Sequence, residues 1–243
     1  MNKKLKTSLL TILLATLFAG GLLIGAALAQ EKSSLLIPPT NSRTVYLLFM
    51  KMTGKPFNAE SVIRGSEAFR AAPGDEQSRM ISTMKPALET EFASLDKDSQ
   101  VLVIRSGVYM RNVTSPYIGL EAKFVQQTKS ADSIYFPYTY GGINIALIPD
   151  KLEPFLNIPM KAAEANAAAL KIISGAATIV IEMIPLSADP RSAMRLDGID
   201  QWLLMTKIVA VSYYNQNMQT IWKWQDPNYR RAGTPSPLQQ LKR

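Results

Sequence analysis

The residue pair with the clearest chemical potential is Ser82 and Lys85, which stand three positions apart. Three residues make about one helical turn, so a helix would place the lysine amine beside the serine hydroxyl and could activate it as a nucleophile. The chain contains no His and no Cys. Zinc sites, Ser/His/Asp triads, Cys/His dyads, haem ligation through His or Cys, and iron–sulfur clusters are therefore excluded. Any catalysis would rest on carboxylates, Lys, Tyr or Ser.

The string Ser82-Thr83-Met84-Lys85 resembles the SxxK element of the serine penicillin-binding proteins and β-lactamases, in which the Ser is the nucleophile and the Lys helps to activate it. The string Tyr213–Asn215 resembles the second motif of that family, in which a Ser or Tyr precedes an Asn by two. The third element, a Lys-Ser/Thr-Gly strand, has no match after Asn215. The resemblance implies a serine-type cell-wall enzyme that uses Ser82 and Lys85.

Helical geometry predicts a different environment for Ser82. An apolar stripe recurs at steps of three and four around it: Met80, Ile81, Met84, Leu88, Phe92 and Leu95. At about 100° per residue, Ser82 lies roughly 130° from the centre of this stripe. We therefore expect Ser82 on a solvated helix face.

A second candidate site is the aromatic segment, which we define as Tyr135 to Gly142. It ends in two glycines and stands between two predicted strands, so we expect a loop. Such a loop can stack sugars or flat ligands, or anchor an interface, because tyrosine buries a large area and keeps a polar tip. The alternative is that its rings close one end of the core. The predicted binding residues are four aromatics of this segment and two C-terminal arginines: Tyr135, Phe136, Tyr138, Tyr140, Arg230 and Arg231.

Metal and cofactor sites are not predicted. Glu182, Asp189, Asp197 and Asp200 lie close together in sequence, but their spacing misses the alternating oxygen ligands of an EF-hand. Asp197-Gly198 is equally a turn signal. We therefore expect no metal and no cofactor.

The first thirty residues are typical of a bacterial secretory signal. A basic start with Lys3, Lys4 and Lys6 precedes the apolar stretch 9–28, and Ala27-Leu28-Ala29 has the small-x-small form of a cleavage site. Cleavage near Ala29/Gln30 would give a periplasmic or secreted protein. The alternative is a retained membrane anchor, because about 20 apolar residues also span a bilayer.

The charge balance indicates the class of partner. The chain has 27 Lys and Arg against 19 Asp and Glu, a formal net charge of +8. Loss of the signal with its three lysines would leave +5. An exported protein seldom meets DNA, so we predict a protein or envelope component as partner and no nucleic acid. Membrane contact is expected only if the N-terminal segment is retained.

The pattern of elements predicts an α+β fold, in which N-terminal helices pack on a largely antiparallel sheet of about six strands. Helices are predicted between residues 40 and 95, with Thr40 or Asn41, Asn58 and Asp75 as caps. A further helix is predicted over 150–174. The six strands are predicted at 101–104, 117–126, 143–147, 178–184, 201–214 and 218–224. We expect a signal peptide (1–29), a linker (30–39), a single domain (40–225) and a flexible basic tail (226–243).

These observations favour an exported bacterial envelope protein with a non-enzymatic binding or accessory role. Two alternatives stay open. The first is the serine-type cell-wall enzyme using Ser82 and Lys85, and the second is a membrane-anchored component of an envelope assembly.

Overall fold

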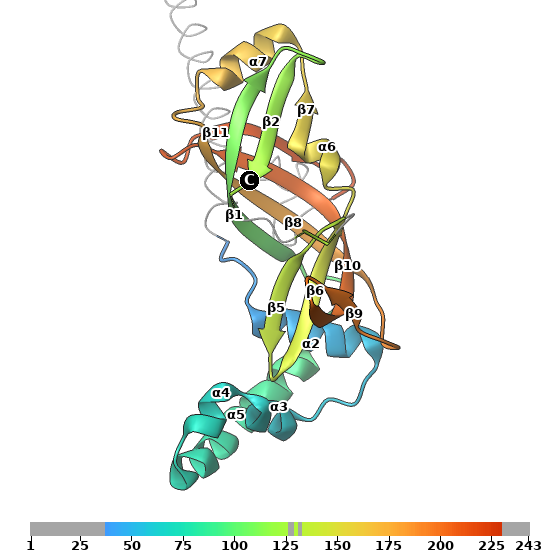
Figure 1. The fold of residues 1–243 in the computed structure, drawn as a ribbon. Helices are drawn as coiled ribbons and strands as arrows, with labels where there is room; N and C mark the ends of the chain where they lie inside the picture. Colours follow the sequence, from blue (N-terminus) through green and yellow to red (C-terminus); the bar gives the residue numbers. More distant parts are fainter. Residues whose placement is uncertain (1–36, 126–128, 131–132, 230–243) are drawn as a thin grey trace, which may run out of the picture. The chain divides into compact units, whose positions relative to one another are not determined.

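The computed structural model describes residues 37–125, 129–130 and 133–229 (Figure 1). The described residues from Pro39 onward belong to one compact unit. Four helices come first: α2 (Ser42–Thr53), α3 (Ala59–Gly65), α4 (Glu67–Ala71) and α5 (Gly74–Ser94). Strands dominate from there on: β1 (Leu102–Val113), β2 (Gly119–Phe124), β3 (Lys129–Ser130), β4 (Ser133–Ile134), β5 (Phe136–Tyr140), β6 (Ile143–Asp150), β7 (Asn157–Pro159), β8 (Ala176–Ala188), β9 (Met194–Leu196), β10 (Ile199–Tyr214) and β11 (Thr220–Gln225). Two helices, α6 (Glu153–Leu156) and α7 (Ala162–Ala169), flank β7.

The sheet differs from the predicted one in size and direction. It has nine strands in the order β5-β6-β10-β8-β1-β2-β7, with β9 and β11 also paired to β10. It is mixed, because β6 runs parallel to β10. After β6 the chain crosses to β7 at the opposite edge before it returns through β8 and β10, so no hairpin joins β6 to β10. The six predicted strands correspond to β1, β2, β6, β8, β10 and β11, and the prediction of a largely antiparallel six-stranded sheet is wrong.

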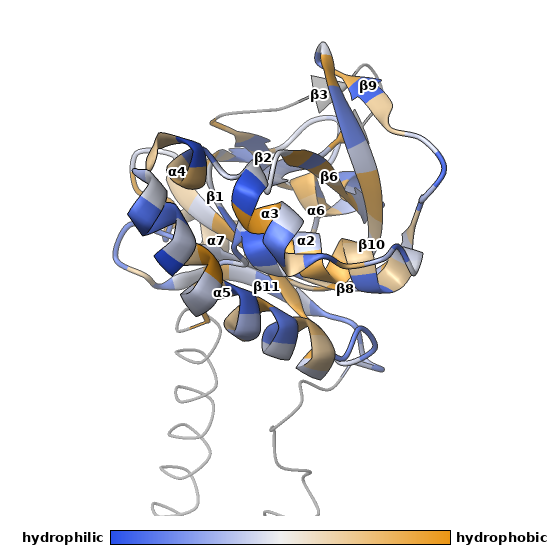
Figure 2. Ribbon diagram, turned by 90° about the horizontal axis from the view of Figure 1, so that it is seen from below, coloured by the Kyte–Doolittle hydropathy of each residue, from blue (hydrophilic) through white to orange (hydrophobic). Residues whose placement is uncertain are grey.

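Helix α2 lies at the centre of the core. The Asn41 side chain caps it by accepting from the backbone N–H of Thr44 at 2.9 Å, and Gly54 ends it with a φ of 64°. Six consecutive residues, 45–50, are buried, so apolar side chains surround the helix on every face. Figure 2 shows α2 among strands of the sheet, and its residues share one core cluster with β1, β6, β8 and β10.

The other early helices pack beside α2 and have their own small core of Ala59, Ile63, Phe69 and Leu88. Asn58 caps α3 as predicted, with its side chain accepting from the backbone N–H of Ser61. The predicted second helix is divided at Ser66, whose hydroxyl bonds the Ile63 carbonyl and accepts from the Phe69 N–H. The predicted cap Asp75 is wrong by two positions, because Pro73 is the cap of α5.

The predicted helix over 150–174 is confirmed in its Ala-rich centre, as α7, but it is not continuous: α6 and strand β7 precede that centre. Pro159 cannot donate a helical hydrogen bond, and Pro154 suits only a first turn, which is where α6 has it. Ile158 is 4% exposed and pairs with Leu120 across β7 and β2, so burial of this residue in the sheet competes successfully with helix propensity.

The start of the predicted tail is held against the sheet. The Asp226 carboxylate accepts from Lys207 Nζ at 2.7 Å and from the backbone N–H of Asn228 at 2.9 Å. The backbone N–H of Asp226 bonds the Val209 carbonyl. Residues 230–243, with the predicted binding residues Arg230 and Arg231, lie outside the described residues, as do the predicted signal peptide and most of the linker.

We predict that the Lys207–Asp226 pair makes stability depend on pH. The Lys207 hydrogen bond, followed by that from Asn228, lowers the pKa of Asp226 below its unfolded value of 3.8. Its contribution to the free energy of unfolding is therefore complete above about pH 4 and is lost as the pH falls through the lowered pKa. Urea unfolding should show a deficit for Asp226→Asn at pH 7 that narrows in acid. Asp200→Asn, which removes an exposed carboxylate, is the control, and a pH-independent deficit would contradict the prediction.

Candidate functional site

The predicted aromatic loop is a strand. Phe136–Tyr140 forms β5, which pairs with β6, and Gly141 and Gly142 make the turn between them with φ values of 57° and 77°. Positive φ at both central residues is typical of a type I′ hairpin turn. The sequence signal of two glycines therefore belongs to a tight hairpin at the sheet edge, and the expectation of a loop is wrong.

Tyr135, immediately before β5, is 2% exposed. Its hydroxyl donates to Asp197 Oδ2 at 2.6 Å and accepts from Gln201 Nε2 at 3.3 Å. Burial, followed by the Asp197 hydrogen bond, raises the pKa of Tyr135. Asp197 and Gly198 form the turn between β9 and β10, with φ values of 47° and 80°. This hydroxyl thus fastens that turn to the sheet.

The other three rings of the segment pack partly against the core. Tyr140 lies 5.6 Å from the Tyr46 ring, and Phe136 lies 5.9 Å from the Phe124 ring. Burial raises the pKa of Tyr138 to about 12. These contacts fit the alternative in which the rings close the core. A binding role for the segment stays a prediction.

The hairpin turn of the aromatic segment also touches α3 at close range. A Cβ atom placed on Gly65 would lie 2.8 Å from the Gly141 carbonyl oxygen, and one on Gly141 would lie 2.9 Å from Val62 Cγ1. Both glycines are therefore required for the β5–β6 hairpin to meet the helix. Because Gly65 and Gly141 have no side chains, α3 and the β5–β6 hairpin can pack closely against each other.

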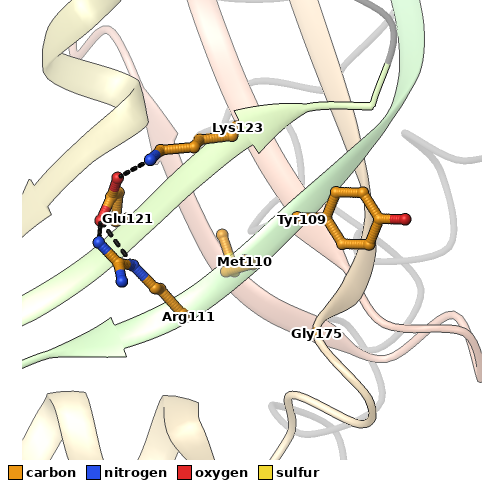
Figure 3. Close-up of a pocket in the computed structure, with 6 residues that line it drawn as sticks. All are labelled: Tyr109, Met110, Arg111, Glu121, Lys123 and Gly175. Carbon is orange, nitrogen blue, oxygen red and sulfur yellow. Dashed lines mark hydrogen bonds and ion pairs between the residues drawn. The ribbon is translucent and has the colours of Figure 1, made fainter.

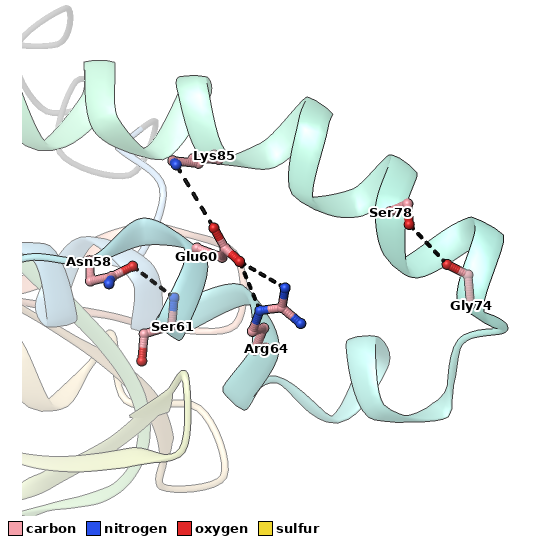
Figure 4. A network of polar contacts seen from close by, with 7 residues as sticks. All are labelled: Asn58, Glu60, Ser61, Arg64, Gly74, Ser78 and Lys85. Atoms are coloured by element: carbon pink, nitrogen blue, oxygen red, sulfur yellow. Dashed lines mark hydrogen bonds and ion pairs between the residues drawn. The ribbon is translucent and has the colours of Figure 1, made fainter.

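Ser82 and Lys85 contact different partners in the structure. The Ser82 hydroxyl is exposed and donates to the Arg79 carbonyl of its own helix at 2.9 Å. Lys85 Nζ lies 3.9 Å from Glu60 Oε2. Figure 4 shows Glu60 between Lys85 and Arg64. The hydrogen bond from Arg64 to Glu60 is the main reason that the pKa of Glu60 is lowered. The expected solvated face for Ser82 is confirmed.

Asn215, from the second motif of the resemblance, belongs to the turn between β10 and β11. Its Oδ1 accepts from the backbone N–H groups of Asn217 and Gln219, and its Nδ2 donates to the Lys171 carbonyl and to Gln219 Oε1. All four contacts hold neighbouring backbone or turn residues in place. Asn215 therefore has a structural task at this turn.

A hollow that sequence reasoning missed lies on the outer side of β1 and β2 (Figure 3). It has a volume of about 340 Å³ and is lined by Tyr109, Met110, Arg111, Glu121, Lys123 and Gly175. Val108 and Met110 point into the core, so alternation turns Tyr109 and Arg111 outward. In the register of the strand pair, Tyr109 lies opposite Lys123 and Arg111 lies opposite Glu121. Figure 3 shows the side chains of Arg111, Glu121 and Lys123 gathered together, with the Tyr109 ring directed away from them. We call these four residues the Tyr109 face.

Electrostatics organise the Tyr109 face around one carboxylate. Glu121 Oε2 accepts from Arg111 Nε at 2.7 Å, and Glu121 Oε1 lies 3.0 Å from Lys123 Nζ. The Glu121 side chain is 16% exposed, whereas those of Arg111 and Lys123 are 69% and 72% exposed. The Arg111 hydrogen bond, followed by that of Lys123, lowers the pKa of Glu121. The carboxylate thus stays charged and holds two outward-facing cations in place.

The alternation of Val108, Tyr109, Met110 and Arg111 is the sequence signal for this face. The predicted first strand stopped at Ile104, seven residues before Arg111, so these residues were not assigned to a strand. No group of three or more acidic residues in the described part of the chain could hold a metal ion. Within the same ranges, no helix is both long and apolar enough to cross a membrane.

Comparison with protein-family models, with curated proteins and with solved structures gave no match to this chain.

We predict that Gly65→Ala destabilises the protein by about 1–3 kcal/mol, because its Cβ would press on the Gly141 carbonyl. Urea unfolding measures the effect. Gly74→Ala in α5 is the matched control, since nothing lies within 4 Å of a Cβ there. We expect that variant to be unchanged or stabilised by up to about 1 kcal/mol. Equal stability of the two variants would show that the close approach is absent.

We predict that a fluorescent penicillin does not label the folded protein covalently. Ser82 and Lys85 have separate partners, so the hydroxyl has no base beside it. Labelling is read on a denaturing gel for the wild type and for Ser82→Ala. A labelled wild type together with an unlabelled Ser82→Ala variant would restore the enzyme alternative.

Proposed function

We propose that this chain is an exported bacterial envelope protein with a non-enzymatic role, which binds a partner protein through the Tyr109 face. One observation carries the choice of surface. Among the described residues, Tyr109 is the one aromatic residue whose side chain is exposed, at 61%. Tyrosine and arginine, here two positions apart on β1, are both enriched at binding hot spots, because both bury large areas and keep polar groups for pairing.

The strands and ion pairs that hold the residues of the Tyr109 face in place suit a binding role. Its residues stand on two paired strands, so the backbone geometry is set before a partner arrives. The Glu121 carboxylate fixes Arg111 and Lys123, which reduces the side-chain entropy that binding would otherwise cost. The cations also remain accessible, and an acidic group on a partner would complement them.

The same arrangement offers little for catalysis. Both Glu121 oxygens already have cationic partners, and the lining of the hollow includes no serine or threonine. The exported location rests on the N-terminal sequence pattern, which lies outside the described residues. The membrane-anchored alternative shares this surface and differs only in whether the N-terminal segment is retained.

We predict that Tyr109→Ser and Arg111→Ser each remove a crosslinked partner from the protein in its native cells. Truncation of a hot-spot residue costs about 2 kcal/mol or more of binding free energy, which is roughly a 30-fold loss of affinity. Chemical crosslinking followed by mass spectrometry identifies the partner. The same spectra show whether the chain begins at Gln30 or keeps its N-terminal segment.

Leu186→Ser is the matched control, because Leu186 is 52% exposed and does not line the hollow. The variant Tyr138→Ala/Tyr140→Ala tests the aromatic segment in parallel. An unchanged partner set in both Tyr109 face variants, with loss in the aromatic segment variant, would return the binding site to the original prediction.

A further inference from the structure

Two turns beyond the Tyr109 face are fastened side by side. We call them the tip: residues 170–175, which lead from α7 to β8, and residues 215–219, which join β10 to β11. Asn215 Nδ2 donates to the Lys171 carbonyl at 3.1 Å, and Gln216 Nε2 donates to Ser174 Oγ at 3.2 Å. Lys171 Nζ bonds the Thr220 carbonyl at 2.8 Å. The tip is therefore a supported structure of two turns.

The tip presents aliphatic side chains outward. Leu170 is 87% exposed, Met218 is 51% exposed and Ile173 is 44% exposed. Single exposed apolar residues are common on protein surfaces. Three of them on two adjoining turns, which are positions that usually carry polar residues, call for a reason outside the core.

The backbone at Met218 strengthens this point. Met218 has a φ of 60°, in the left-handed region that glycine and asparagine occupy most easily. Its backbone N–H bonds the Asn215 carbonyl, so the turn imposes this conformation. A glycine would satisfy the hairpin with less strain, whereas a large apolar side chain adds nothing to the core from an exposed position. Folding alone does not explain a methionine here.

The tip carries one charged side chain. Within residues 170–175 and 215–219 it is Lys171. Lys171 lies on the tip itself, directly after Leu170, and is exposed. Aliphatic side chains with a neighbouring cation complement an anionic lipid surface, where the side chains enter the acyl boundary and the cation meets the headgroups.

We propose that the tip docks on an anionic lipid bilayer, with Leu170, Ile173 and Met218 inserted. Exposed aliphatic side chains beside the Lys171 cation on two turns favour a fluid lipid surface over a protein. The proposal does not depend on the Tyr109 face as a binding site. The two surfaces meet at one loop, since Gly175 lines the hollow and Ser174 bonds the Gln216 side chain.

Vesicle flotation tests the proposal with the chain that begins at Gln30, the predicted cleavage product, which lacks the apolar N-terminal stretch. The wild type should float with vesicles of equal parts phosphatidylglycerol and phosphatidylcholine and should bind pure phosphatidylcholine more weakly. Leu170→Ser should lower partitioning by roughly tenfold, because one aliphatic side chain no longer enters the bilayer. Met218→Gly should also lower partitioning, while its Tm stays equal or rises because strain is relieved.

Met194→Ser is the matched control. Met194 is 51% exposed, as Met218 is, but it pairs with Gln201 near the start of β10, whereas Met218 follows the end of that strand. This variant and Tyr109→Ser should float like the wild type. The proposal is overturned if the wild type does not float, if it binds the two lipid mixtures equally, or if Leu170→Ser and Met218→Gly float unchanged. If the wild type does not float and the Leu170→Ser variant loses a crosslinked protein in cells, the tip would be assigned to a protein partner instead.

Discussion

The burial of α2 on all sides is the constraint on which the architecture depends. A surface helix needs apolar contacts on one face only, whereas residues 45–50 of α2 are all buried and need contacts around the whole circumference. Strands β5, β6 and β8 cover part of the circumference and α5 covers another part, so the curled sheet and the helices enclose α2 together. Strand β10 makes this possible, because it pairs with β8 along one side and with β6 and then β11 along the other. Its register shifts near Met205 and Ile208 supply local bends of the kind that β-bulges introduce.

The curled sheet also determines where binding residues can lie. Alternate residues of β1, β8 and β10, such as Leu102, Ile181 and Tyr213, belong to the core. Some residues of the opposite parity, such as Val180 and Tyr214, are buried too, so the exposed residues and the turns are what stays available for binding. Trp222 and Trp224 are aromatic residues that pack partly against the core. Trp222 lies beside Tyr213, and Trp224 lies beside Phe155. Tyr109 is the outward counterpart on β1. Aromatic content alone therefore indicates little about function until the face of each strand is known.

Sequence reasoning located elements better than it located their partners. The caps Asn41 and Asn58 and the turn at Asp197-Gly198 were predictable, because each depends on a few neighbouring residues. The parallel pairing of β6 with β10 was not, since it depends on contacts between residues more than fifty positions apart. The sequence predicts a loop at β5 because the segment ends in two glycines between predicted strands, although these glycines belong to the turn that follows β5. The candidate site was missed for a related reason: the outward position of Tyr109 becomes visible only when β1 is known to extend to Val113.

The Tyr109 face and the tip constrain each other through the loop 170–175. Its last residue, Gly175, lines the hollow and accepts from the backbone N–H of Met110, while Lys171 and Ser174 hold the neighbouring turn. A bilayer in contact with Leu170 would therefore lie close to a partner bound at Tyr109. Such a partner has to tolerate the headgroup region, and the outward cations Arg111 and Lys123 would be shared between its acidic groups and the lipid. The proposed function thus favours a membrane-associated protein with an acidic surface over a freely diffusing one.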